Sequence, residues 1–69
     1  MQTKLDELLT DEQFGEIAGA SRVTRYSWRL KGLGPKFVRV GPRRIAYRRS
    51  DVEEWLRART FASLVEERG

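Results

Sequence analysis

Apolar residues near the start of the chain recur with the period of a short helix. Phe14, Ile17 and Ala18 are spaced at i, i+3 and i+4, which places them on one helix face. The four residues before Phe14, Thr-Asp-Glu-Gln, match a capping box, in which the threonine and glutamine side chains satisfy free backbone N–H groups. We therefore predict a helix over residues 11–18 that ends at Gly19 and buries this stripe.

A second helix is predicted almost immediately afterwards. Ser21 is a favourable N-cap, and the polar and apolar pattern runs from about Arg22 to Lys31, where Gly32 ends it. Two helices joined by a tight turn that contains glycine form the helix-turn-helix pattern.

The second helix divides into two faces at 100° per residue. Val23 and Leu30 lie on one face, together with Ser27, and we expect that face to pack against the core. The opposite face carries three arginines: Arg22, Arg25 and Arg29. Because guanidinium groups pair bidentately with guanine or phosphate, this face is predicted to enter a DNA groove. The alternative is a surface helix with incidental arginines.

A short β-hairpin follows. Residues 36–40 alternate like a strand, residues 45–48 read as the returning strand, and the intervening Gly-Pro-Arg-Arg is turn chemistry. Beside a helix-turn-helix, such a hairpin is a wing, and Arg43 and Arg44 at its tip are placed to reach a minor groove or phosphates. In the alternative interpretation the hairpin is structural, and its arginines only discourage edge pairing.

The last predicted element is a third helix. Ser50 begins a second capping-box sequence, and Val52, Trp55 and Leu56 then follow at core spacing. Since no glycine or proline interrupts the following residues up to Arg68, we expect the helix to continue past Arg59.

Three apolar residues lie in that extension beyond the small core: Phe61, Leu64 and Val65. We hypothesise that they contact a protein partner or a neighbouring copy. Alternatively, they fold back onto the core or fray.

The charges are strongly segregated along the chain. Between Ser21 and Ser50 there are ten basic residues and no acid, whereas residues 1–20 carry a net charge of −4 and residues 51–69 a net charge of −2. A concentrated positive block with acidic flanks is the electrostatic pattern of a nucleic-acid binder. A solvated face that only aids solubility normally mixes both signs.

Composition excludes several other classes. The chain has 69 residues, which allow one small domain, and it has no cysteine and no histidine, so a zinc site, a metal cofactor and a nucleophile–base pair are not expected. It has no glycine-rich phosphate loop, and we predict neither enzyme activity nor a small-molecule ligand. With no apolar run near the roughly 20 residues of a membrane span and no signal-peptide pattern, we expect a cytoplasmic, nucleoid-associated protein without a membrane partner.

The order of these elements resembles the excisionase-type branch of the MerR-like winged helix-turn-helix family, which includes phage excisionases, also called recombination directionality factors. The resemblance is strongest over residues 34–41, Gly-Pro-Lys-Phe-Val-Arg-Val-Gly, and over residues 47–56, Tyr-Arg-Arg-Ser-Asp-Val-Glu-Glu-Trp-Leu. It departs from the family pattern at Phe14-Gly15, where many relatives have paired small residues, and at Arg25, where relatives often have valine.

The resemblance implies a fold that is mostly helical with a small β-hairpin wing, a single winged helix-turn-helix domain. We expect residues 1–9 to be a lead-in, residues 10–59 the domain and residues 60–69 a helical tail. The residues implied to contact the major groove are Ser21, Arg22, Arg25, Tyr26 and Arg29. Those implied at the wing are Arg43 and Arg44, and the candidate phosphate contacts are Lys36, Arg39, Arg48 and Arg49.

The resemblance also implies a function. Proteins of this kind bind and bend attachment-site DNA, often as several copies, and direct a phage integrase toward excision. The alternative within the same class is a small transcriptional regulator at a promoter, although the short chain argues against a ligand-sensing one. A third hypothesis is an adaptor whose basic block docks an acidic protein.

Overall fold

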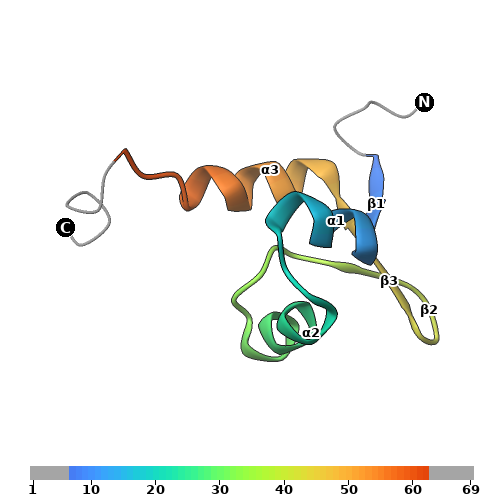
Figure 1. The fold of residues 1–69 in the computed structure, drawn as a ribbon. Coiled ribbons are helices and arrows are strands. Elements are labelled where there is room, and N and C mark those ends of the chain that lie inside the picture. Colours follow the sequence, from blue (N-terminus) through green and yellow to red (C-terminus); the bar gives the residue numbers. More distant parts are fainter. Residues whose placement is uncertain (1–6, 63–69) are drawn as a thin grey trace.

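The computed structural model describes residues 7–62 as one small domain of three helices and a three-stranded antiparallel sheet (Figure 1). The elements in chain order are β1 (Leu8–Thr10), α1 (Asp11–Ala18), α2 (Arg22–Lys31), β2 (Val38–Gly41), β3 (Arg44–Arg48) and α3 (Arg49–Ala58). This arrangement confirms the predicted winged helix-turn-helix fold.

The first two helices begin and end where local chemistry favours it. Thr10 Oγ1 accepts a hydrogen bond from the Gln13 backbone N–H at 3.0 Å, and the Gln13 side chain accepts one from the Thr10 backbone N–H at 2.9 Å. Ser21 caps α2 in a related way. Gly19 and Gly32 end the two helices with φ of 67° and 69°, a conformation that side chains with a Cβ disfavour. The predicted bounds of both helices are confirmed.

The sheet has the order β1-β3-β2, so the returning strand of the hairpin is central. Leu9 of β1 pairs with Tyr47, and Val38 of β2 pairs with Ala46. Residues 1–9 are predicted as a lead-in to the domain. The part that the structure describes ends as an edge strand, which leaves β2 on the opposite edge.

The core is an aromatic cluster between the sheet and the helices. Phe14 is fully buried, with its ring centroid 4.5 Å from that of Tyr47 and 5.5 Å from that of Trp55. Trp28 of α2 packs 5.5 Å from Trp55, and Val52 of α3 is buried beside the cluster. All three helices therefore meet around Phe14, and this contact fixes α2 against the sheet.

Outside α2, two predicted core positions are wrong. Ile17 is 48% exposed and Leu56 is also exposed. In α1 the inward arc runs through Phe14, Ala18 and Gly15, and Ile17 lies about 60° outside it on the solvent side.

The start of α3 also differs from the prediction. The helix begins at Arg49, directly after β3, so Ser50 already lies inside the first turn and its hydroxyl does not cap the helix. Arg48 holds the N-cap position without a side-chain hydrogen bond. The backbone N–H of Arg49 instead donates to the Glu7 carbonyl at 2.8 Å, so the residue just before β1 supplies the partner.

The predicted continuation past Arg59 is wrong, because α3 ends at Ala58. The Arg59 guanidinium donates to the Leu33 carbonyl at 2.7 Å and lies 4.6 Å from the Trp55 ring centroid. The Thr60 hydroxyl donates to the Leu56 carbonyl at 2.7 Å, which satisfies one free acceptor of the last turn. Phe61 is exposed after this end, whereas the prediction for Leu64 and Val65 falls outside the described residues.

Candidate nucleic-acid interface

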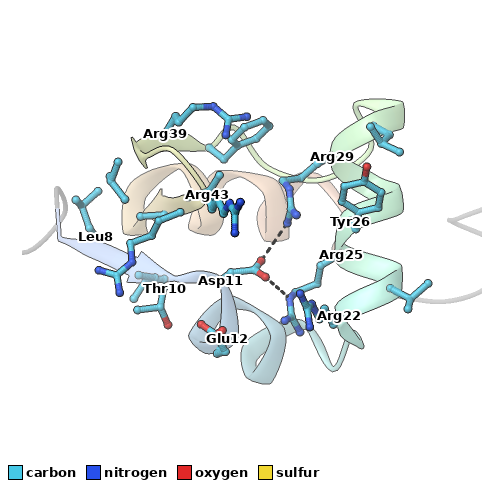
Figure 2. Close-up of a pocket in the computed structure, with 18 residues that line it drawn as sticks. Leu8, Thr10, Asp11, Glu12, Arg22, Arg25, Tyr26, Arg29, Arg39 and Arg43 are labelled. Carbon is cyan, nitrogen blue, oxygen red and sulfur yellow. Dashed lines mark hydrogen bonds and ion pairs between the residues drawn. The ribbon is translucent and has the colours of Figure 1, made fainter.

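A groove lies between α2 and the β2–β3 hairpin, with the start of α1 at its floor (Figure 2). Its cations come from both sides and are Arg22, Arg25, Arg29, Arg39, Arg43 and Arg44. Apolar side chains lie among them and include Val23, Leu30, Phe37 and Val40. The fold therefore gathers arginines from two elements at one surface.

The buried and exposed sides of α2 are the reverse of the predicted ones. Val23 and Leu30, expected in the core, are 77% and 70% exposed, whereas Arg25, expected on the surface, is only 8% exposed. The reason is Trp28, whose ring lies 6.3 Å from that of Phe14 and fills the aromatic core. Burying this large ring removes more apolar area from water than burying Val23 would, so it determines the inward side.

Arg25 is held inside the protein. Its Nε lies 3.1 Å from Asp11 Oδ2, and its Nη1 donates to the Ala20 carbonyl at 2.8 Å. The guanidinium crosses α1 at Gly15, where a Cβ would lie 2.9 Å from Arg25 Cζ. The predicted exposed position of Arg25 is therefore wrong, and we assign it no contact with DNA. The signal in the sequence was the valine that relatives often carry at this position.

Arg29 is partly buried in the groove, with its side chain 21% exposed against 9% for that of Arg25. Its Nη1 is 3.2 Å from Asp11 Oδ1, and its Cζ lies 5.6 Å from the Tyr26 ring centroid. Figure 2 shows both ion pairs meeting at Asp11. This carboxylate thus partly neutralises the floor of the groove while the rim stays positive.

Tyr47 joins the same network from the central strand. Its hydroxyl donates to Asp11 Oδ1 at 3.5 Å, and the residue is 1% exposed. Burial raises the pKa of the Tyr47 hydroxyl above the ordinary value of 10.0 because it disfavours the phenolate. The sequence places Asp11 only within the predicted capping-box motif. Its role as the anchor of α2 was missed, because no local pattern links it to residues 14 and 18 positions later.

Four groove arginines remain exposed: Arg22, Arg39, Arg43 and Arg44. Within residues 7–62 none of these four forms an ion pair. Among the groove arginines, these four therefore have no ion pair within the described residues that would compete with an anionic partner. Tyr26 is exposed beside them on α2.

The remaining predicted contacts lie outside the groove lining. Ser21 caps α2, and Lys36 is exposed in the connector before β2. Arg48 lies 3.9 Å from Asp51, while Arg49 pairs with Glu7 at 3.3 Å and with Glu53 at 3.7 Å. Thus the structure groups seven of the eleven predicted residues around the groove and leaves these four at its flanks.

Among residues 7–62 no group of three acids is placed to hold a metal ion. No helix in that range is long and apolar enough to cross a membrane.

Comparison with known proteins identifies the fold family. A family model described as a helix-turn-helix domain matches residues 8–60, which include every helix and strand of the structure. No curated protein and no solved structure matches the chain. The chain belongs to the helix-turn-helix domain family, a DNA-binding family that includes excisionase-like members.

Proposed function

We propose that this protein is a DNA-architectural protein of the excisionase kind, which binds and bends attachment-site DNA and directs a phage integrase toward excision. The observation that carries the proposal is the groove, in which α2 and the wing present exposed arginines from two sides. Duplex DNA is the partner whose grooves and phosphates fit a basic helix beside a basic hairpin.

In this proposal α2 occupies the major groove. A helix with its side chains is about 10–12 Å in diameter, so the major groove, about 12 Å wide, admits one helix. Arg22 lies at its N-terminal end with a free guanidinium, which suits bidentate pairing with guanine O6 and N7. Tyr26 and Arg29 follow along the same side.

The wing would contact the adjacent minor groove or backbone. Arg43 lies in the turn between β2 and β3, Arg44 begins β3, and Arg39 projects from β2 toward the same groove. Lys36 and Arg48 at the flanks are assigned to phosphates, and Ser21 to the backbone beside the N-terminus of α2. Arg49 would contact a phosphate only after its two exposed ion pairs, with Glu7 and Glu53, are broken, and such pairs cost little to break.

Contacts from α2 and from the wing on both sides of the DNA backbone would provide a reason for the DNA to bend. Smooth bending of a short site costs about 1–6 kcal/mol, which protein–DNA and protein–integrase contacts must offset. In such a system, directionality comes from the assembly formed on bent DNA, and the strand chemistry belongs to the integrase.

The deciding experiment is a binding selection on fragmented source DNA, followed by footprinting of the retained fragments at physiological salt. Tandem same-direction sites filled cooperatively beside an integrase gene or an attachment core would support the excision role. One isolated site over a promoter would contradict it and identify a transcriptional regulator. Retention of no DNA would mean that the basic block docks an acidic protein.

The C-terminal tail is proposed as the contact to the integrase or to a neighbouring copy. Of the three apolar tail residues, Phe61 is the one within the described residues, and it is exposed. The test is the Phe61→Ala/Leu64→Ala variant, measured for cooperative filling of tandem sites and for integrase binding. Unchanged values in both assays would remove the tail from the proposal.

A further inference from the structure

The outward side of α2 is apolar at its centre. Val23 and Leu30 are seven residues apart, which places them on one side of the helix about 10 Å apart along its axis. Both line the groove and are among the most exposed large apolar residues of the described chain. Tyr26 lies between them and is also exposed.

This face is unusual, because the side of a surface helix that points away from the core normally carries polar residues. Here the inward side holds Arg25 and the outward side holds Val23 and Leu30. The inversion leaves apolar groups on the surface that the proposed function brings nearest to base edges.

The surroundings of these side chains indicate what covers them. Arg22 and Arg29 flank them on α2, and Arg39, Arg43 and Arg44 face them from the hairpin. A partner that covers this patch must therefore be strongly anionic and must also offer apolar groups at its surface. In the major groove of DNA the exposed apolar group is the C5-methyl group of thymine, beside phosphates on both rims.

We infer that Val23 and Leu30 read thymine methyl groups, so that the target site carries thymines at two positions about three base-pair steps apart. This inference rests on the proposed binding of α2 in the major groove. It assigns the two apolar residues to sequence readout, while Arg22 reads guanine and the wing contacts the backbone.

The test uses uracil, which lacks only the C5-methyl group of thymine. A duplex is first enriched from a synthetic random-sequence pool with the wild-type protein, and it is then prepared in two forms, with thymine or with uracil throughout. We expect the uracil form to bind the wild type more weakly, by roughly three- to fivefold for each methyl contact. The Val23→Ala/Leu30→Ala variant should bind the two forms with nearly equal affinity.

Two controls separate this effect from others. Ile17→Ala also truncates an exposed apolar residue, but one on α1 outside the groove lining, and it should keep the full preference for thymine. Because Val23 and Leu30 are exposed, their truncation should leave the unfolding midpoint nearly unchanged, which circular dichroism verifies.

The outcomes distinguish this inference from the function on which it rests. Specific binding by the wild type with equal affinity for both forms would overturn the inference and leave the proposed function intact. A preference for thymine that persists in the double variant would also overturn it, because the methyl groups would then act through DNA shape. Failure to enrich any sequence would overturn both.

Discussion

Asp11, the first residue of α1, holds Arg25 on the inward side of α2, with Asp11 Oδ2 3.1 Å from Arg25 Nε. The other oxygen of the same carboxylate lies 3.2 Å from Arg29 Nη1. One carboxylate therefore binds two arginines one helical turn apart. These ion pairs set the rotation of α2 together with Trp28, and the rotation in turn determines which side chains face the groove.

The Asp11→Asn substitution should lower the free energy of unfolding of the domain by about 2–3 kcal/mol. The reason is that the variant keeps the shape of the side chain but leaves the buried Arg25 guanidinium without its counter-charge. The measurement is urea unfolding followed by tryptophan fluorescence, since Trp28 and Trp55 lie in the core.

Glu12→Gln is the matched control for this variant. Glu12 lies in the same first turn and is exposed, so its neutralisation removes only a helix-dipole contribution of about 0.3–1 kcal/mol. Equal destabilisation by the two substitutions would show that Asp11 acts through the dipole and not through Arg25.

Gly15 and Arg25 should be energetically coupled. A methyl group at Gly15 would collide with the Arg25 guanidinium and lie 3.1 Å from the Ala20 carbonyl oxygen. In the wild type this collision opposes the gain of about 1 kcal/mol that alanine brings inside a helix. In an Arg25→Ala background, Gly15→Ala should therefore change the free energy of unfolding more favourably than it does in the wild type, by about 1 kcal/mol. A double-mutant cycle measured by urea unfolding gives this coupling, and a value near zero would contradict the contact.

Tyr47 should make the domain sensitive to alkaline pH. Because burial raises its folded-state pKa above 10.0, the unfolded chain loses the phenolic proton first as the pH rises. This contribution to stability is fully present below pH 10.0 and is lost between that value and the raised pKa of the folded state. We expect Tyr47→Phe to show a smaller fall in unfolding free energy above pH 10.0 than the wild type.

Tyr26→Phe provides the control for the alkaline measurement. Tyr26 is exposed, so this variant removes a phenol that the fold does not bury. If both phenylalanine variants flattened the profile equally, burial of Tyr47 would not be its cause.

Much of the fold follows from local sequence signals. The Thr10–Gln13 capping box and the positive-φ glycines Gly19 and Gly32 set the bounds of α1 and α2, and these were predictable because each depends on neighbours within a few residues. The hairpin was predictable for the same reason. The β1 strand was not, since its pairing with β3 joins residues about 40 positions apart.

The rotation of α2 could not be obtained from its own pattern. Periodicity distinguishes two faces but does not state which one is inward, and counting apolar residues favoured the side of Val23 and Leu30. The decision depends on Trp28 filling a space left by Phe14 and Trp55, and on Asp11 neutralising Arg25. Of the wing arginines, Arg43 lies in the turn as predicted, because the turn residues themselves define that position, whereas Arg44 is the first residue of β3.

The wing and α2 should contribute to DNA binding in different ways. Arg43 and Arg44 are exposed at the hairpin turn, where contacts to phosphate carry no sequence information. Arg43→Ala/Arg44→Ala should therefore weaken binding to specific and random duplexes alike, and it should reduce the slope of log affinity against log salt by about 0.9 for each lost phosphate contact.

Arg22→Ala should instead cost about 1–3 kcal/mol on the selected duplex and little on random DNA. Lys31→Ala, an exposed cation of α2 outside the groove lining, is the control and should change neither value greatly. The measurement is fluorescence anisotropy over a salt series with both duplexes. Equal losses from Arg22→Ala on the two duplexes would exclude base readout by Arg22 and would restrict its role to the backbone.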